Sequence, residues 1–298
     1  MTDIDRIDHA IIVTLGELDP LAAGFERLGF TVSPTSRHHA NTSPGEPPRP
    51  LGTANRCIVF TENYLELLGI VDPDAGDEWG VRRMAAAYEG LRGQVLGTTD
   101  PHALDRRLTA AGVATSRVLT LERAVDTPAG PAVLRAEAVR LDLGEVPGEG
   151  GLAFGRIADR SVLFQPALMK HANGALGLAA ITFVVADDEL AHYVARYTTL
   201  LDVEVRQNGP RSVFALEHNR VEFVPESAMA QVLPGETAPV LPYVAAQTIT
   251  VADLAAARAL VEGNGVPTRT VDGGFLVGAA AAFGAATIFT ASNSLGAR

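Results

Sequence analysis

The sequence predicts an α+β protein built from four copies of a βαβββ unit, arranged as two domains. Short runs rich in β-branched and apolar residues alternate with helical patterns at a regular interval. Glycines stand at the expected ends of the first two helices, Gly29 and Gly112. A chain of 298 residues with 47% hydrophobic content is long and apolar enough for more than one core. We expect the boundary near residues 172–177, which gives domains over 1–172 and 173–298.

The first unit begins at the apolar, β-rich run Ile7-Asp8-His9-Ala10-Ile11-Ile12-Val13. Its helix and later strands are expected at residues 19–28 for the helix and at 30–32, 57–60 and 64–70 for the strands. Between them lies a run of prolines over residues 43–50, which lacks the backbone donors of a helix interior or a central strand. We expect this run to be a loop at the mouth of a cavity.

The second unit has the best-defined helix of the chain. Asp100 is a plausible N-cap, Pro101 suits the first helical position, and Gly112 suits a left-handed C-cap. The helix is therefore expected over 101–111. The strands of this unit are expected at 94–96, 118–121, 134–141 and 162–165, and a glycine-rich segment at 147–151 is expected to be flexible.

The third and fourth units occupy the second half of the chain. In the third, a strand from Ala180 precedes a helix at 189–200 and strands at 203–205, 212–216 and 220–224. In the fourth, a strand at 247–251 precedes a helix at 253–262 and alanine-rich strands up to Thr290. Propensity alone allows helix or strand over 278–286, and the repeat favours strand there.

Composition excludes several classes of protein. The net charge of −11 opposes nucleic-acid binding, which depends on basic side chains that neutralise phosphates. The single cysteine, Cys57, excludes an intramolecular disulfide and fits a reducing compartment. No segment reaches the roughly 20 apolar residues of a membrane span, and the first residues do not form a signal peptide. We expect a cytoplasmic monomer or homodimer with neither nucleic-acid nor membrane partners.

Several segments resemble glyoxalase-like domains when they are taken in order. They are the first strand with His9, Gly52-Thr53-Ala54-Asn55-Arg56, Tyr64-Leu65-Glu66-Leu67 and His171-Ala172-Asn173-Gly174-Ala175. The chain thus resembles the vicinal-oxygen-chelate superfamily, which includes glyoxalases, bleomycin resistance proteins and extradiol dioxygenases, over roughly residues 6–180. The resemblance implies that βαβββ units pair into curved half-barrel sheets around a small-molecule cavity.

The resemblance also implies a metal site. In this superfamily the ligands lie on the first and last strands of each unit, which places His9 and Glu66 in the first unit and Gly93 or Gln94 with Gln165 in the second. Imidazole and carboxylate groups bind divalent ions directly, and open coordination positions let substrate oxygens bind the same ion. The expected metal ligands are His9, Glu66 and Gln165, for Zn, Fe, Mn, Ni or Mg. An amide is a weak third ligand, so a protein without metal stays an alternative.

Other polar residues complete the expected site. His171 is expected to act with Glu66 in catalysis or to supply the missing ligand, and His38 and His39, in the loop before the prolines, are alternatives for both roles. The substrate-binding candidates are His38, His39, Asn55, Arg56, Gln94 and Asn173. The structural alternatives are a buried His9 bonded to a backbone carbonyl, a Glu66 to Arg56 ion pair, and a simple turn at residues 171–174.

The second half keeps the pattern of units but loses the ligands. Ala180 and Ala246 stand at the histidine places, and Glu222 alone keeps a carboxylate. A lone carboxylate does not hold a divalent ion against water, so this half is expected to be structural or to form a lid.

These observations leave three functions open. The first is an enzyme in which a divalent ion stabilises charge on a small, oxygen-rich substrate, as a lyase, isomerase or dioxygenase. The second is a protein that binds a drug or other small molecule without chemistry, and the third, ranked last, is an interaction scaffold formed by the degenerate half.

Overall fold

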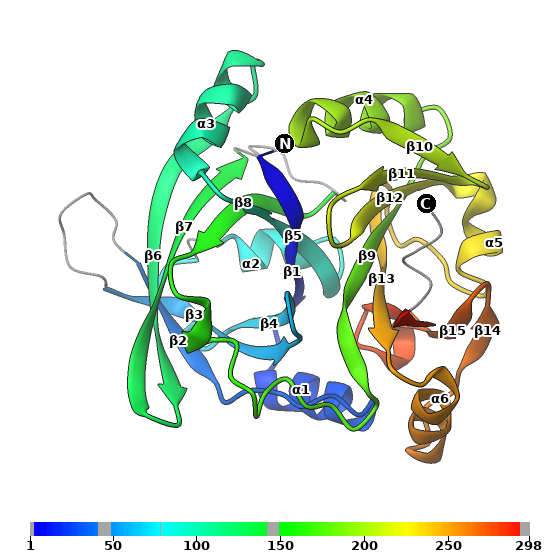
Figure 1. The fold of residues 1–298 in the computed structure, drawn as a ribbon, viewed down its shortest axis with the longest axis horizontal. Coiled ribbons are helices and arrows are strands. Elements are labelled where there is room, and N and C mark those ends of the chain that lie inside the picture. Colours follow the sequence, from blue (N-terminus) through cyan, green and yellow to red (C-terminus); the bar gives the residue numbers. More distant parts are fainter. Residues whose placement is uncertain (1–2, 41–48, 78, 142–148, 293–298) are drawn as a thin grey trace.

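The computed structural model describes residues 3–40, 49–77, 79–141 and 149–292. In these residues sixteen strands form two eight-stranded sheets, one of which closes into a barrel. Figure 1 shows the two sheets side by side, with helices on the outside of each. The expected α+β class with four βαβββ units is confirmed.

The barrel consists of the first two units. The first contains β1 (Ile4–Thr14), α1 (Leu18–Arg27), β2 (Ser36–Ala40), β3 (Arg49–Val59) and β4 (Tyr64–Ile70). After the short helix α2 (Val81–Ala85), the second contains β5 (Gly90–Thr98), α3 (Pro101–Ala110), β6 (Thr115–Thr127), β7 (Gly130–Leu141) and β8 (Gly151–Ile157). The strand order is β1-β4-β3-β2-β6-β7-β8-β5, so the two units meet at the β1/β5 pair and again at the β2/β6 pair.

The second sheet repeats this plan without closing. The third unit contains β9 (Ala175–Val185), α4 (Leu190–Leu201), β10 (Val205–Asn208), β11 (Arg211–Ala215) and β12 (Arg220–Pro225). After α5 (Met229–Val232), the fourth contains β13 (Tyr243–Val251), α6 (Leu254–Gly263), β14 (Arg269–Val271), β15 (Gly274–Val277) and β16 (Ala286–Ala291). The antiparallel β9/β13 pair forms the centre, and β10 and β14 form the two ends.

The helices form where the sequence signals them. Asp100 accepts a hydrogen bond from the Ala103 amide at the start of α3, and Asp253 does the same from Ala256 at the start of α6. Gly112 has φ +79°, which is the left-handed conformation of a C-cap glycine. α1 buries Leu18, Leu21, Ala22 and Phe25, which recur every three to four residues and so face the sheet together.

The two sheets share one hydrophobic core. Its buried side chains come from both halves of the chain, and the rings of Phe30 and Phe289 stack across the junction at 5.8 Å. Residues 158–174 connect β8 to β9, and the proposed boundary between residues 172 and 173 falls in this connection. Because the core is continuous, the second sheet supports the barrel directly.

Four expectations about strands and loops were wrong. Residues 30–32 are not a strand, and His38 and His39 lie on β2 rather than in a loop. Residues 162–165 are not a strand, since Val162 ends the 3-10 turn Arg160–Val162. The last strand of the second unit is β8, whose glycine-rich start resembles a loop in the sequence. Residues 278–285 contain the 3-10 turn Ala279–Ala281 between two strands. The predicted loop over residues 43–48 lies outside the described residues, and Arg49 and Pro50 begin β3.

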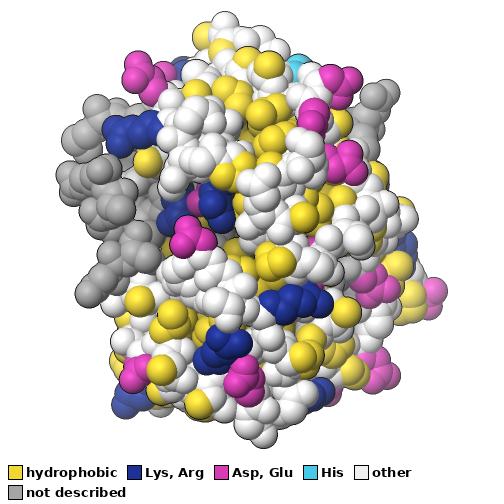
Figure 2. Space-filling view, turned by 90° about the vertical axis from the view of Figure 1, so that its right-hand side faces the viewer, with side chains coloured by type: hydrophobic (Ala, Val, Ile, Leu, Met, Phe, Trp, Pro, Cys, Tyr) yellow, Lys and Arg dark blue, Asp and Glu magenta, His cyan; other side chains and the backbone are white. Residues whose placement is uncertain are grey.

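Figure 2 shows the face of the molecule on the side of the second sheet. Basic and acidic side chains are interspersed there among hydrophobic ones. In the part of the chain that the structure describes, no helix is both long and apolar enough to cross a membrane.

Candidate functional site

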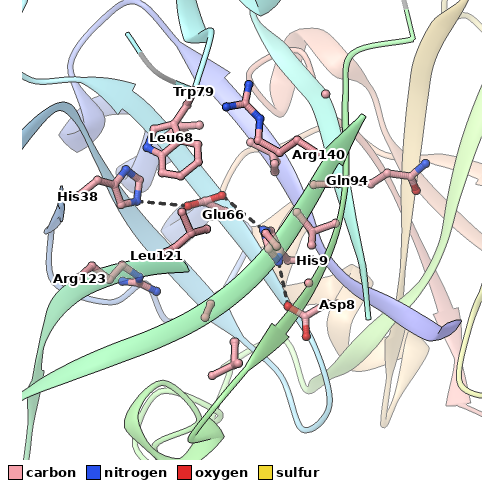
Figure 3. Close-up of a pocket in the computed structure, with 18 of the residues that line it drawn as sticks. Asp8, His9, His38, Glu66, Leu68, Trp79, Gln94, Leu121, Arg123 and Arg140 are labelled. Atoms are coloured by element: carbon pink, nitrogen blue, oxygen red, sulfur yellow. Dashed lines mark hydrogen bonds and ion pairs between the residues drawn. The ribbon is translucent and has the colours of Figure 1, made fainter. Parts of the chain in front are cut away.

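The barrel encloses a cavity of about 180 Å³. Its wall contains side chains from strands of both units, including His9, Glu66 and Arg123, together with Trp79 from the segment before α2 (Figure 3). Apolar side chains such as Ile11 and Leu121 fill much of the remaining wall. Since a cavity of about 150 Å³ in a protein interior accepts benzene, this one has room for a small molecule.

Glu66 lies at the centre of the polar part of this wall. Its side chain comes from β4 and accepts a hydrogen bond from the Asn55 amide of β3 on Oε1. His9 Nε2 lies 3.6 Å from Oε2, and His38 Nε2 lies 3.6 Å from Oε1. Two imidazoles from β1 and β2 therefore approach opposite oxygens of one buried carboxylate, as the dashed lines in Figure 3 show.

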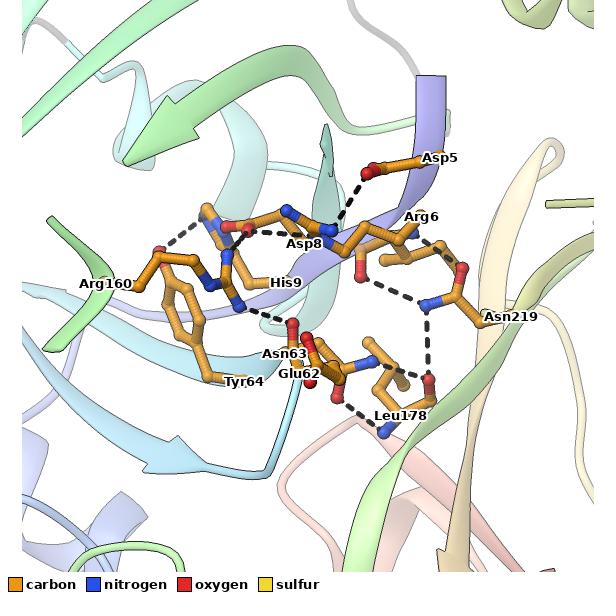
Figure 4. Close-up of polar contacts among 11 residues, drawn as sticks. Asp5, Arg6, Asp8, His9, Glu62, Asn63, Tyr64, Arg160, Leu178 and Asn219 are labelled. Atoms are coloured by element: carbon orange, nitrogen blue, oxygen red, sulfur yellow. Dashed lines mark hydrogen bonds and ion pairs between the residues drawn. The ribbon is translucent and has the colours of Figure 1, made fainter. Parts of the chain in front are cut away.

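His9 is oriented by Asp8, the preceding residue. Asp8 Oδ2 lies 3.0 Å from His9 Nδ1, and Asp8 Oδ1 accepts a hydrogen bond of 3.0 Å from Arg160 (Figure 4). Adjacent residues of a regular strand point to opposite faces, but the register of β1 against β5 shifts between Ile7 and His9, as at a β-bulge. The shift lets both side chains reach the cavity wall, and the bond at Nδ1 leaves Nε2 directed toward Glu66.

The pKa values of His9 and Glu66 are set by burial and by the charges that these side chains place next to one another. Burial disfavours the imidazolium of His9, but the carboxylates of Asp8 and Glu66 outweigh it and raise the pKa of His9 to about 9. Burial likewise disfavours the charged carboxylate of Glu66, but hydrogen bonds from His38 and His9 hold its pKa well below the usual range. Glu66 is therefore ionised.

His38 is oriented in the same way as His9. Its Nδ1 lies 2.9 Å from the Thr53 hydroxyl, and its ring meets the indole of Trp79 edge to face at 5.9 Å. Its other nitrogen is left facing Glu66. The structure thus brings together His9, His38, Glu66 and Asn55, four of the residues that the sequence singled out, and His39 also lines the cavity.

The two glutamines expected at the site bond partners other than Glu66. Gln165, in the turn after Arg160–Val162, donates to the carbonyl oxygens of Asp126 and Val162, so it does not occupy a last-strand position. Gln94 lines the cavity, but it points away from Glu66 in Figure 3 and donates to the Tyr197 hydroxyl of α4. The third residue of β8, which matches the place of Glu66 in β4, is Ala153.

Three further candidates serve the structure instead. Arg56 donates to Asp19 and to the Ser33 carbonyl oxygen, so it is not the partner of Glu66. His171 accepts a hydrogen bond from the Thr31 amide and bonds the Val59 carbonyl oxygen through Nε2, at the connection between the sheets. Burial lowers the pKa of His171. Asn173 donates to the Leu28 carbonyl oxygen, and none of these three residues is among those that line the cavity.

The sequence did not single out several residues that line or support the cavity. They are Asp8, Thr53, Tyr64, Trp79, Arg123 and Arg140. For Arg123 a signal was present, because Leu119, Leu121, Arg123 and Val125 alternate along one strand and the arginine occupies an inward place. For Asp8 there was none, because alternation from His9 places it on the other face.

The side chains of His9, His38 and Glu66 are of the kinds that bind divalent ions. Two imidazole nitrogens and a carboxylate face one another, and the remote nitrogen of each imidazole is held by Asp8 or Thr53, as is usual around metal ligands. Ligand atoms about 2.1 Å from one ion lie roughly 3.0–3.4 Å apart. Among the described residues no group of three or more His, Cys, Asp or Glu side chains already surrounds one point, so small side-chain shifts are required.

Comparison with known proteins identifies the family. The glyoxalase-like domain family matches residues 7–201, which is more than half of the chain. This chain belongs to the glyoxalase-like domain family. Its resemblance to the vicinal-oxygen-chelate superfamily is thereby confirmed. Comparison with curated proteins returned no match.

Solved structures show the same fold at low sequence identity. A hypothetical protein from Staphylococcus aureus has a TM-score of 0.62 at 13% identity, covering 96% of this chain and 98% of that one. A variant of 4-hydroxymandelate synthase from Streptomyces coelicolor has a TM-score of 0.55 at 14% identity, covering 91% and 78%. A fusion of a xylose isomerase-like TIM barrel with 4-hydroxyphenylpyruvate dioxygenase has a TM-score of 0.56 at 14% identity, covering 90% and 39%. All three share the fold of this glyoxalase-like chain.

Proposed function

We propose that this glyoxalase-like protein is a divalent-metal-dependent enzyme that acts on a small, oxygen-rich molecule in the barrel cavity. The observation that carries the proposal is the approach of two imidazole nitrogens, each at 3.6 Å, to the two oxygens of the buried Glu66 carboxylate. His9, His38 and Glu66 would hold the ion, and His38 on β2 would be the third ligand instead of Gln165. Two histidines and one carboxylate form the ligand set of many non-haem iron oxygenases.

A bound divalent ion would supply a positive charge that polarises two substrate oxygens, or a site for dioxygen if the ion is iron. Of the reaction types considered, a dioxygenase is favoured by the two-histidine, one-carboxylate set and by the name of one structural neighbour, the fusion with 4-hydroxyphenylpyruvate dioxygenase.

The protein's own residues prepare this site. Asp8 holds His9 so that Nε2 faces the cavity, and Asn55 holds Oε1 of Glu66. The Tyr64 hydroxyl lies 3.5 Å from His9 Nε2, where it is near enough to donate a proton to a substrate oxygen or to orient it. Burial raises the pKa of Tyr64 well above its usual value, so the hydroxyl keeps its proton at neutral pH.

Metal content tests the proposal. Protein stripped with EDTA is reloaded separately with Fe²⁺, Mn²⁺, Zn²⁺, Ni²⁺ or Mg²⁺, dialysed and measured by mass spectrometry of the elements. The wild type should retain about one ion per chain for at least one metal, and His9→Ala, His38→Ala and Glu66→Gln should each lose it. Gln165→Ala is the matched control, because its side chain lies outside the cavity, and it should bind as the wild type does.

A second function is a carrier that binds a small molecule without chemistry. It is favoured by Ala153, which leaves the second unit without a carboxylate at the place that matches Glu66. Equal and near-zero metal in the wild type and all four variants would support the carrier and end the metalloenzyme proposal.

A further inference from the structure

Arg123 differs from other arginines around the cavity. Its side chain lines the cavity from β6, and the residue is 8% exposed. The guanidinium donates to Asn55 Oδ1 at 3.2 Å and to Cys57 Sγ at 3.6 Å. Both acceptors are neutral, since burial raises the pKa of the Cys57 thiol to about 11 despite the nearby guanidinium.

Three arginines near the cavity each bond a carboxylate. Arg156 bonds Glu137 at 2.6 Å, Arg160 bonds Asp8 at 3.0 Å and Arg135 bonds Glu122 at 2.8 Å. Among the described residues Arg123 bonds only these two neutral acceptors, and a buried charge is costly when no bonded group of opposite charge offsets it. Arg123 is linked to an acidic residue only indirectly: it bonds Asn55, and Asn55 bonds Glu66. Glu66 itself faces His9 and His38.

The cavity limits what kind of anion can complete this pair. Asp8 and Glu66 line the same space and repel a doubly charged group, which favours a single negative charge. A guanidinium binds a carboxylate through two parallel hydrogen bonds, and a volume of about 180 Å³ excludes long chains. A second guanidinium, that of Arg140, lines the cavity 5.7 Å from the Trp79 ring and adds to the positive potential.

We propose that the ligand of this cavity is a small organic monocarboxylate, with its carboxylate bound by Arg123 and a further oxygen directed toward Glu66, His9 and His38. This inference rests on the proposed function for the location of the site, but it does not require the metal. Arg123 is then the residue that selects a charged ligand over a neutral one of the same shape.

Matched pairs of ligands test the inference. Benzoate is compared with benzamide, and lactate with lactamide, by thermal shift and calorimetric titration at constant ionic strength on metal-loaded and metal-free protein. The wild type should bind at least one acid at least tenfold more tightly than its amide. Arg123→Met should remove that preference, and Arg123→Lys should keep part of it. Arg135→Met is the control, because it removes an exposed arginine of the adjacent strand, and it should behave as the wild type does.

The outcomes separate this inference from the metal proposal. An Arg123→Met protein that keeps the full preference, or a wild type that binds neither acid better than its amide, overturns the inference. Arg123→Gln, which keeps a donor for Asn55, replaces Arg123→Met if the latter does not fold. A preference that depends on Arg123 in a wild type without metal affinity supports the inference and ends only the metal proposal.

Discussion

Glu66 in the barrel and Glu222 in the second sheet occupy the same place in their βαβββ units but have different partners. Glu66 pairs with Ile11 of the first strand of its unit, and Glu222 pairs with Thr182 of the first strand of its own. His9 and Ala180, each two residues earlier on these strands, therefore correspond to each other. Glu222 is bonded by Arg220 at 2.5 Å, Arg211 at 3.2 Å and Thr182 at 3.1 Å. Glu66 instead faces two imidazoles, a type of side chain that binds metal ions.

The difference shows how one position serves two purposes. Guanidinium groups keep their charge at any ordinary pH. The ion pairs of Glu222 with Arg211 of β11 and Arg220 of β12 help to hold these two strands together. The barrel also closes through the β2/β6 pair, whereas β10 and β14 remain the ends of the second sheet. We therefore expect changes at Glu66 to affect ligand binding and changes at Glu222 to affect folding.

The largest expected effect is at Glu66. Glu66→Gln removes the anionic ligand, and metal affinity should fall at least about 100-fold, as titration with a competing chelator will measure. Glu222→Gln, the same change at the corresponding place, should leave metal affinity within about twofold. Equal losses in both variants would contradict the assignment of the site to the barrel.

A second effect is expected where the second sheet meets β1. Asn219 accepts a hydrogen bond of 2.7 Å from the Ile7 amide and donates one of 3.1 Å to the Ile7 carbonyl oxygen, next to the shift in register that directs Asp8 and His9 (Figure 4). Asn219→Ala should cost about 1–3 kcal/mol of stability in urea unfolding, because it leaves buried backbone groups unpaired. It should also lower metal affinity roughly tenfold by loosening His9.

The control for Asn219 is Asn264→Ala. Asn264 donates to the Arg27 carbonyl oxygen, which also joins the two halves of the chain but belongs to α1. This variant should leave metal affinity unchanged. If both variants lower metal affinity alike, the second sheet supports the barrel as a whole and Asn219 has no special part in orienting His9.

A third effect concerns the stability of the second sheet. Glu222→Gln leaves two arginines without their carboxylate, but both side chains are partly solvated, so the cost should be about 1–3 kcal/mol rather than that of a fully buried pair. Urea unfolding followed by circular dichroism will measure it. A variant as stable as the wild type would show that the ion pair is dispensable.

The smallest effect depends on pH and concerns His171. Its pKa in the folded protein is lower than in the unfolded chain because of burial, so the folded state favours the neutral imidazole. This contribution is complete above a pH of about 6.5 and is lost as the pH falls through the folded pKa. His171→Phe keeps a ring beside Phe30 and Phe60, and its stability relative to the wild type should improve as the pH falls from 7.5 to 5.5. A difference in stability between the two proteins that stays constant across this pH range would contradict the lowered pKa of His171.

The sequence was most informative where signals are local. The cap at Asp100 and the glycine after α3 located that helix to within about two residues. The family resemblance then placed His9 and Glu66 on the first and last strands of the first unit, and the structure brings their side chains together. The closed barrel itself was less accessible, because the β2/β6 pairing joins residues that are far apart in the sequence.

Local patterns also misled in identifiable places. The glycine-rich start of β8 has loop composition, and only pairing with β5 and β7 makes it a strand, so Gln165 was given a place that belongs to Ala153. His38 was assigned to a loop because its strand is short and borders the prolines. Asp8 was missed because a shift in strand register is set by tertiary contacts, among them those of Asn219.

The most direct test of the central claim is anomalous X-ray diffraction from crystals of the full chain loaded with Mn²⁺ or Fe²⁺. We expect one strong peak inside the barrel, within about 2.3 Å of His9 Nε2, His38 Nε2 and a Glu66 oxygen. A metal peak elsewhere, or an empty barrel in crystals whose protein was saturated with metal, would contradict it.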